Sequence, residues 1–255
     1  MTINHGITNH EIFAPKKYLQ YIETDGFRAF RDKDNTESAC SNYAVLKSTK
    51  DINGSIKAAE DFIIEAGSVP KFAMRPDALP LSEVHYALVA HGYEIKTSIA
   101  VRMLLENPEY DRSKIKYETK ILRDITGAVR ELAIFEDEGA DFGVKMLDKQ
   151  LAAGAVLCCA YNNEHAPVAI CLAEGYGETL YLSDVYTHPS FRRRGYGAAA
   201  VRSAICYGAD KEYALIYLYA SGEDSQKMYE GLGFTPEQHE HFWAYKGGLP
   251  DWLKD

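Results

Sequence analysis

Regular spacing of hydrophobic positions divides the second half of the chain into short alternating elements. Apolar or alternating runs predict strands, whereas apolar residues recurring every three to four positions predict helices. The predicted strands are 115–122, 155–161, 167–172, 180–187, 213–220 and 240–245. The predicted helices are 125–135, 141–153, 198–205 and 224–231, and residues 162–165 form a predicted hairpin turn. This order of strands and helices predicts an α+β architecture.

A second, fainter set of elements fills the first half of the chain. Strands are predicted at 42–46, 70–75 and 98–105, and helices at 55–66 and 81–91. The polar stretch 107–113, which contains a proline, separates this set from the second half. At 255 residues the chain is long enough for two domains of ordinary size. The pattern therefore predicts a domain of residues 1–110 followed by a domain of residues 111–255.

The most specific motif follows the predicted strand at 180–187. Pro189 ends that apolar run, and Arg192-Arg-Arg-Gly-Tyr-Gly197 then precedes a helical segment of small residues. A strand, a glycine turn and a helix start can hold a pyrophosphate, because free N–H groups and the positive end of the helix dipole face the anion. Glycines let the backbone turn and approach the ligand closely. The spacing excludes a nucleoside triphosphatase loop, and the first glycine of a dinucleotide fingerprint is missing.

A second motif lies downstream at a suitable distance. The sequence Tyr229-Glu-Gly-Leu-Gly-Phe234 follows a predicted buried strand and begins within a short predicted helix. Together with the pattern Arg192-x-x-Gly195-x-Gly197, it resembles the GNAT superfamily of N-acetyltransferases, including its FR47-like members. The order of predicted elements in 111–255 is that of the GNAT fold, in which helices flank a mixed central sheet.

The first half resembles a degenerate copy of the same fold. Aligning the Gly-Tyr pair at 92–93 with the Gly-Phe pair at 233–234 places Leu88 opposite Tyr229, and this half has no arginine-glycine motif. We therefore expect two tandem GNAT-like lobes, the first of which packs against the second and shapes its acceptor site. An unrelated α/β domain is the alternative for this half.

The resemblance implies a site for acetyl-coenzyme A, and no metal, in the second lobe. The backbone of Val185, Tyr186 and Thr187 is expected to pair with the pantetheine arm, where this strand bulges away from its neighbour. Arg192 is expected to anchor the loop or to reach a phosphate, although arginine runs also occur at ordinary solvated corners. The pyrophosphate is expected on Arg193, Arg194, Gly195, Tyr196, Gly197 and Ala198.

Acetyl transfer also needs a proton donor for the departing thiolate and a proton acceptor for the amine. Tyr229 matches the family's general acid, and an ordinary tyrosine, with a pKa of about 10, keeps its proton at neutral pH. Asp184, on the strand before the motif, is the first candidate base, although it could equally cap a turn or pair with an arginine. Glu174 and the run Glu136-Asp137-Glu138 are further candidates.

One position departs from the family's pattern. Many relatives carry an asparagine seven residues before the tyrosine, where this chain has Gly222. That asparagine contacts the pantetheine arm, so Ser221 or Ser225 would have to supply the hydrogen bond here.

The resemblance implies an N-acetyltransferase that moves acetyl from acetyl-coenzyme A to a primary amine by direct attack. No cysteine lies in a context that suggests a covalent nucleophile. The acceptor stays open among a small amine, an amino acid, an antibiotic and a protein N-terminus. The rivals are a coenzyme A-binding sensor with little catalysis, against which the intact Tyr229 argues, and an acyltransferase that uses another acyl-coenzyme A.

Composition and charge argue against several other classes of protein. The net charge of −9 argues against non-specific binding of nucleic acid. Five scattered cysteines predict no disulfide framework, and adjacent Cys158 and Cys159 have no histidine pair at metal-ligand spacing, so buried reduced thiols are expected. No apolar run reaches the roughly 20 residues that cross a bilayer, and no signal peptide is evident. We expect a cytoplasmic protein without a membrane partner, for which assembly as a homodimer stays open.

Overall fold

The computed structural model describes residues 3–136 and 141–248, which form two compact units. Unit 1 combines the residues up to Ala14 with Val101–Gln238, and unit 2 combines Pro15–Ala100 with the residues from His239 onward. The chain passes between the units at three points, two of which lie inside strands. Each unit is therefore assembled from segments that are far apart in the sequence.

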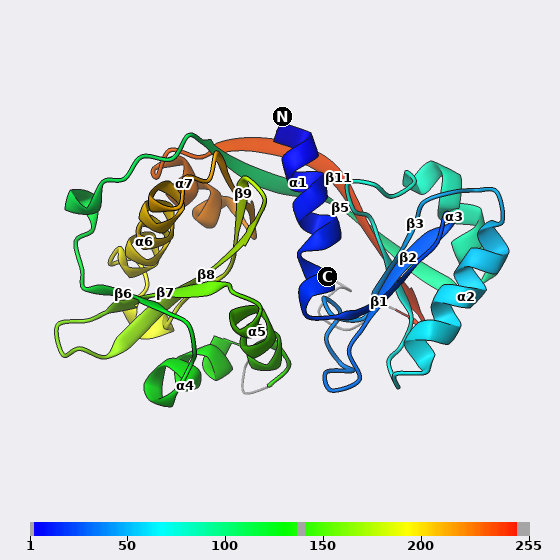
Figure 1. The fold of residues 1–255 in the computed structure, drawn as a ribbon, viewed down its shortest axis with the longest axis horizontal. Coiled ribbons are helices and arrows are strands. Elements are labelled where there is room, and N and C mark those ends of the chain that lie inside the picture. Colours follow the sequence, from blue (N-terminus) through cyan, green and yellow to red (C-terminus); the bar gives the residue numbers. More distant parts are fainter. Residues whose placement is uncertain (1–2, 137–140, 249–255) are drawn as a thin grey trace. The chain divides into compact units, whose positions relative to one another are not determined.

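Unit 1 is an α+β unit built on a mixed sheet of order β5–β10–β9–β8–β7–β6 (Figure 1). β9 and β10 are parallel, and the other neighbours in this list are antiparallel. Its strands are β6 (Thr119–Leu122), β7 (Val156–Tyr161), β8 (Pro167–Tyr176), β9 (Thr179–Thr187), β10 (Leu215–Ala220) and parts of β5 (Tyr93–Glu106) and β11 (Thr235–Lys246). Its helices are α1 (Ile3–Phe13), α4 (Gly127–Glu136), α5 (Phe142–Ala152), α6 (Tyr196–Asp210) and α7 (Glu223–Glu230).

Helices cover both faces of the unit 1 sheet. Ile216 of β10 is buried in a core with residues of α6, whereas Leu157 of β7 is buried on the other face with residues of α4 and α5 (Figure 1). Tyr217, next to Ile216, is buried with Ile7 of α1. Because successive side chains of a strand point to opposite faces, α1 covers β10 on the face opposite α6.

Unit 2 is a second α+β unit with its own core. Its strands run in the order β1 (Gln20–Glu23), β2 (Phe27–Arg31), β3 (Tyr43–Leu46), β4 (Lys71–Ala73) and the second part of β11. β3 and β4 are parallel, and the other pairs are antiparallel. α2 (Ile52–Ile64) and α3 (Leu81–Ala90) bury Ile56 and Leu88 against Phe72 of β4.

Most predicted elements are confirmed, with ends that differ by a few residues. Among the α-helices and strands of the described residues, α1, β1 and β2 carry no clear pattern in the sequence and were not predicted. β1 is exposed along its whole length, so it shows no alternation of apolar and polar residues. The predicted strand 115–122 is wrong in its first half: residues 115–118 are irregular, follow a short 3-10 helix at Arg112–Lys114 and lead into β6.

The division into residues 1–110 and 111–255 stays a prediction. The compact units differ from it, because α1 and part of β5 belong to the same unit as the second half of the chain. In the described ranges 3–136 and 141–248, no helix is long and apolar enough to cross a membrane. Cys158 and Cys159 are buried, as expected, and Cys40 is exposed.

Candidate functional site

β9 is interrupted near its end. Its register with β8 shifts between Ile170 and Leu172, and Asp184 has a positive φ of 47°. β9 pairs with β10 through residues 179–181 only, so no ladder joins the later residues of these two described strands. The parallel strands therefore separate beyond the pair Tyr181 and Tyr217, as the family resemblance implies. The edge of β9 that faces β10 is left without a strand partner from that point.

The loop between β9 and α6 has the backbone of an anion cradle. Gly195 caps α6 with a left-handed φ of 91°, and Arg193 has a φ of 61°. A Cβ on Gly197 would lie 2.8 Å from Thr187 Oγ1, so only glycine lets the first turn of α6 approach β9 this closely. The free N–H groups at the start of α6 are consequently placed beside the separated strand.

Arg192 anchors this loop, which is one of the two roles expected for it. Its Nε donates a hydrogen bond of 3.0 Å to the Thr187 carbonyl, and its guanidinium lies 5.8 Å from the centre of the Tyr186 ring. The side chain thus holds the loop against β9. These two contacts explain the position of the Arg192 side chain without a bound phosphate.

The next two arginines point in different directions. Arg193 forms an ion pair of 3.2 Å with Asp224 of α7, and both side chains are exposed. The Arg194 guanidinium lies 5.7 Å from the centre of the Phe191 ring, and the Arg194 carbonyl accepts a hydrogen bond of 2.6 Å from the Tyr117 hydroxyl. These contacts of Arg194 stabilise the loop, and the residue does not line the cavity.

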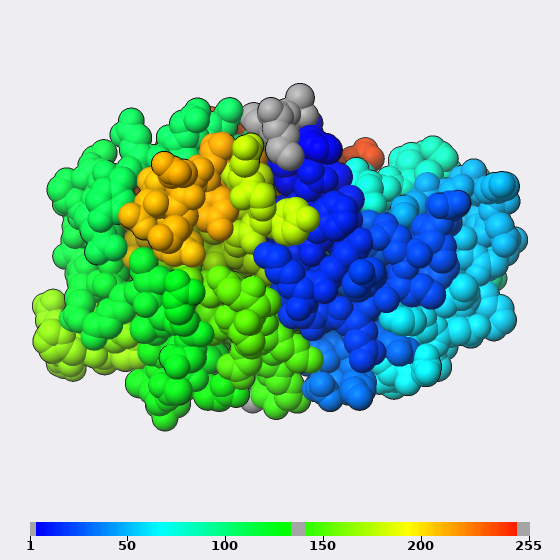
Figure 2. All heavy atoms as spheres, in the orientation of Figure 1, coloured from blue at the N-terminus to red at the C-terminus, as the bar shows by residue number. Residues whose placement is uncertain are grey.

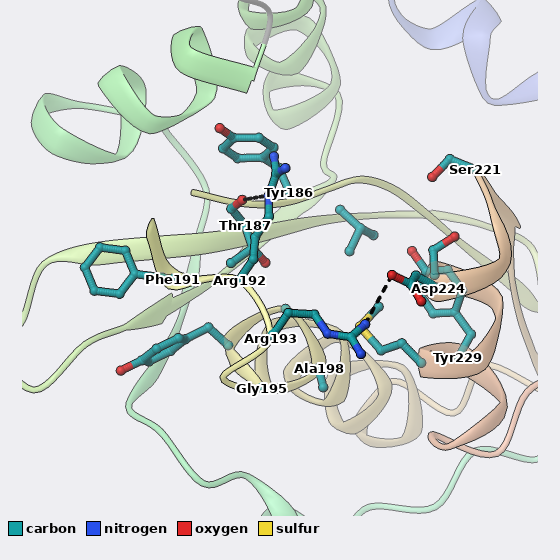
Figure 3. A pocket seen from close by; sticks show the side chains of 15 residues that line it. Tyr186, Thr187, Phe191, Arg192, Arg193, Gly195, Ala198, Ser221, Asp224 and Tyr229 are labelled. Carbon is teal, nitrogen blue, oxygen red and sulfur yellow. Dashed lines mark hydrogen bonds and ion pairs between the residues drawn. The ribbon is translucent and has the colours of Figure 1, made fainter. Parts of the chain in front are cut away.

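These elements surround a cavity of about 520 Å³ (Figure 3). Nine of the ten residues predicted to bind the cofactor line it, and Arg194 is the exception. The nine are Val185, Tyr186, Thr187, Arg192, Arg193, Gly195, Tyr196, Gly197 and Ala198. In Figure 3, Arg193 reaches across from the loop toward Asp224 on α7.

Tyr229 lines the same cavity from α7. Its side chain is 4% exposed and packs edge-on against Phe234, with ring centres 6.0 Å apart. Burial raises the pKa of the Tyr229 phenol well above its ordinary value, with a smaller contribution from Cys171. The phenol therefore stays protonated at neutral pH and can donate a proton into the cavity.

Comparison with known families decides the identity of this part of the chain. Residues 121–234 match the model of the acetyltransferase (GNAT) family. This segment is a GNAT domain. The match includes both motifs, the cavity and Tyr229, and the family implies an acyl-coenzyme A cosubstrate. No curated protein sequence matches the chain.

Solved structures share the fold over nearly the whole chain. A GCN5-related N-acetyltransferase from Kribbella flavida matches 100% of both chains with a TM-score of 0.75 at 16% identity. A conserved protein of unknown function from Staphylococcus epidermidis matches 95% of this chain and 98% of its own with a TM-score of 0.65 at 15% identity. A tandem GNAT protein from the clavulanic acid biosynthesis pathway covers 95% of this chain and 89% of its own, with a TM-score of 0.60 and 12% identity. The chain thus has the α+β GNAT fold in two tandem lobes, as expected.

The GNAT domain does not bring every base candidate to the cavity. Asp184 lies in the bulge of β9, accepts a hydrogen bond of 2.6 Å from the Ser183 hydroxyl and is not among the lining residues. Glu174 is buried in β8, and its Oε2 lies 3.9 Å from Nε2 of His10 on α1, which covers the face of the sheet opposite α6. Asp137 and Glu138 lie outside the described residues, as does the side chain of Glu136. The identity of the base stays a prediction.

The position that departs from the family's pattern has a local explanation in the GNAT domain. The Gly222 amide donates to Ser225 Oγ at 3.1 Å, and that hydroxyl donates to the Gly222 carbonyl at 2.7 Å. Both serines offered as substitutes line the cavity. Because Ser225 is used to begin α7, Ser221 is the better candidate for a bond to the cosubstrate.

Three further lining residues of the GNAT domain escaped the sequence reasoning: Phe191, Asp224 and Met228. Met228 precedes the recognised Tyr229 by one residue, and both line the cavity from α7. Asp224 carries no signal in the sequence, because its partner Arg193 is 31 positions away and the two meet only in the folded chain.

Proposed function

We propose that unit 1 transfers an acetyl group from acetyl-coenzyme A to a primary amine by direct attack of the amine on the thioester. The observation that carries the proposal is one cavity, lined both by the cradle that ends in Gly197 and by the buried phenol of Tyr229. A diphosphate-bearing thioester and a proton donor are the two partners that such a cavity can bring together. That the acceptor is a primary amine and that the transferred group is acetyl are both parts of this proposal.

The lining residues fit such a cosubstrate. The volume of about 520 Å³ is within the range of small-molecule sites. Because Gly197 has no side chain, the start of α6, with its backbone N–H groups, lies close to Thr187 at one end of the cavity. Beyond Tyr181, where β9 no longer pairs with β10 in the described strands, the edge of β9 offers main-chain groups to an extended arm, in the manner of an added strand.

The thioester of acetyl-coenzyme A supplies an activated acyl carbon. Around it, the backbone of Val185 to Thr187 would orient the arm, and the start of α6 would hold the diphosphate. Tyr229 would give its proton to the departing sulfur, for which a buried, protonated phenol is suited. Holding both reactants in one cavity would itself supply much of the rate enhancement.

The test is thiol release from acetyl-coenzyme A over a panel of an alkylamine, an aromatic amine, an amino acid, an aminoglycoside and a peptide with a free N-terminus. Calorimetry with coenzyme A measures binding separately. We expect Tyr229→Phe to bind acetyl-coenzyme A as the native protein does but to lose about 100-fold in kcat. Equal turnover by the two proteins would remove Tyr229 from the mechanism.

The same assays separate the rivals. Binding of coenzyme A without turnover of any amine would favour a sensor or an interaction module. Turnover with succinyl- or longer acyl-coenzyme A in preference to acetyl-coenzyme A would change the donor but keep the site. Failure to bind coenzyme A would overturn the proposal altogether.

A further inference from the structure

The segment that joins β5 to β6 brings a tyrosine to the cradle loop. Tyr117 lies just before β6 and outside the residues 121–234 that match the family model. Figure 2 shows the green residues of this segment at the left edge of unit 1. Tyr117 contacts the loop but is not among the residues that line the cavity, so it acts on the loop from outside.

Two contacts join Tyr117 to the start of α6. Its ring packs on that of Tyr196, the first residue of the helix, with ring centres 4.0 Å apart and planes inclined by 30°. Its hydroxyl donates a hydrogen bond of 2.6 Å to the Arg194 carbonyl. Tyr196 itself lines the cavity. The ring contact therefore places the Tyr117 hydroxyl, and the hydroxyl holds one carbonyl of the loop.

The support behind Tyr117 is part of the folded core of unit 1. The carbonyl of the next residue, Glu118, accepts a hydrogen bond of 2.9 Å from the Tyr161 amide of β7. Ile115 and Tyr117 both pack against the core that contains α6. The Tyr117 hydroxyl thus has a fixed position, because its residue is held by the sheet on one side and by this core on the other.

The bond to the Arg194 carbonyl also sets the direction of the next amide. The C=O of Arg194 and the N–H of Gly195 belong to one planar peptide unit, and in a trans peptide they point in opposite directions. Gly195 lines the cavity, whereas Tyr117 does not. With its carbonyl held toward Tyr117, the peptide unit directs the Gly195 N–H toward the cavity. In the described part of the chain this N–H donates no backbone hydrogen bond, so it is available to a ligand.

The loop needs this external hydrogen bond because its own backbone permits the opposite orientation. Gly195 has a φ of 91°, and glycine adopts positive and negative φ with similar ease. Rotation of the Arg194–Gly195 peptide unit would turn a carbonyl oxygen into the cavity. An inward carbonyl would repel the diphosphate that the cradle is proposed to bind. Whether the cradle offers a donor or an acceptor at this point therefore depends on a group outside the loop.

We propose that Tyr117 is a positioning residue for the diphosphate of the cosubstrate, an inference that rests on the proposed function. Its hydroxyl holds the Arg194 carbonyl outward and so keeps the Gly195 N–H directed at a diphosphate oxygen. Tyr117 does not itself contact the cosubstrate and takes no part in acyl transfer. It should consequently affect binding of the cosubstrate and leave the chemical step unchanged.

The test compares Tyr117→Phe with Tyr110→Phe. Phenylalanine at 117 keeps the ring contact with Tyr196 and removes only the hydroxyl. Tyr110 lies in the same segment, is 56% exposed and has its ring beside Arg112, so it is the matched control. Calorimetry should show about fivefold weaker binding of coenzyme A by Tyr117→Phe, because one hydrogen bond is lost. With any amine that reacts, KM for acetyl-coenzyme A should rise by the same factor at unchanged kcat. Tyr110→Phe should behave as the native protein does.

Pantetheine distinguishes positioning of the diphosphate from a general loosening of the cavity. It carries the arm of coenzyme A but no diphosphate. We expect Tyr117→Phe to bind pantetheine as the native protein does. Equal weakening for pantetheine and coenzyme A would overturn the inference, because the hydroxyl would then support the cavity as a whole. Native affinity of Tyr117→Phe for coenzyme A would overturn it as well.

A measurement on Gly195 itself does not depend on turnover. In protein labelled with nitrogen-15 glycine, the Gly195 N–H resonance is identified by its absence from the spectrum of Gly195→Ala. We expect inorganic pyrophosphate to move this resonance downfield in the native protein and by less than half as much in Tyr117→Phe. Equal movement in both would contradict the inference. A native protein that binds neither coenzyme A nor pyrophosphate would instead defeat the proposed function, and the inference with it.

Discussion

Single atoms decide whether the cradle can form. A Cβ on residue 197 would lie 2.8 Å from Thr187 Oγ1, which is closer than nonbonded atoms approach without displacement. Gly195 instead is needed for its backbone, because a φ of 91° is open to glycine and strained for other residues. The two glycines of one short motif therefore serve different physical needs.

We expect Gly197→Ala to weaken binding of coenzyme A by about tenfold or more, since overpacking costs roughly 1–3 kcal/mol. Adding Thr187→Ala removes the clashing oxygen and should restore most of the affinity. Gly231→Ala is the control, because a Cβ there would make only ordinary contacts of 3.4 Å or more. Calorimetric titration with coenzyme A measures all four proteins, and an unaffected Gly197→Ala would contradict the close approach.

Glu23 of unit 2 shows how one carboxylate makes stability depend on pH. Glu23 belongs to an exposed strand, but its side chain is 28% exposed, and this partial burial tends to raise its pKa. Hydrogen bonds and ion pairs with Lys16 and Lys47 outweigh it and lower the pKa to about 2. Unfolded glutamate titrates near 4.3. Its contribution to stability is therefore present above that value and is lost as pH falls toward 2.

We expect Glu23→Gln to lower the free energy of unfolding of unit 2 by about 1–2 kcal/mol at neutral pH. The difference from the native protein should shrink as pH falls from about 4.5 to about 2. Urea unfolding across this pH range measures it. Glu65→Gln, which removes an exposed partner of Arg31, should change little. A Glu23→Gln deficit that stays constant with pH would refute this account.

At the scale of elements, α7 closes one side of the cavity through a contact between surface charges. Asp224, in its first turn, pairs with Arg193 of the cradle, and both side chains are about four-fifths exposed. Such pairs contribute little to stability. The pair instead holds a cation of the cradle away from any anion that the cradle would bind.

We expect Asp224→Asn to change the free energy of unfolding by less than about 0.5 kcal/mol and to strengthen binding of coenzyme A by about threefold, because Arg193 is released toward the phosphates. Calorimetry at two salt concentrations measures the affinity, and the gain should fade at high salt. Glu223→Gln removes the same charge from the same helix but pairs with Lys227, so it is the matched control. Equal gains in affinity in both variants would mean that the effect comes only from the change in net charge.

At the scale of the whole molecule, unit 1 depends on segments from outside the recognised GNAT match. Residues 101–106 of β5 pair along all of β10, and Met103 is fully buried in the core of α6. α1 buries Ile7 against Leu215 and Tyr217 on the other face. Removing either segment exposes apolar surface and an unpaired strand edge.

We therefore expect a fragment of residues 111–255 not to unfold cooperatively in urea, unlike the full chain. It lacks α1 and the β5 segment, so β10 would be an open edge and the fragment should associate. Urea unfolding followed by near-ultraviolet circular dichroism, with size-exclusion chromatography, checks this. A monomeric fragment with a sharp transition and native affinity for coenzyme A would restore the boundary predicted from the sequence.

Much of the site could be predicted because its chemistry is local in the sequence. The cradle occupies residues 185–198, a continuous strand, turn and helix start. In this stretch the apolar pattern and the positions of the glycines predict the structure directly. Tyr229 was found through its own short motif. Arg194 does not line the cavity, and its contact with Tyr117, which lies 77 positions earlier, could not be read from the sequence. Asp224 could not be found, because its partner Arg193 lies on another element.

The sequence by itself determined the order of most elements, the glycine turn and the tyrosine, since each depends on spacing within a few consecutive residues. Only the tertiary structure decided that α1 and part of β5 complete unit 1, that β9 and β10 separate after Tyr181, and that Tyr117 holds the Arg194 carbonyl. The physical reason is that pairing between distant strands and burial beneath a helix arise from long-range packing. Neither leaves a periodic mark on the residues that take part.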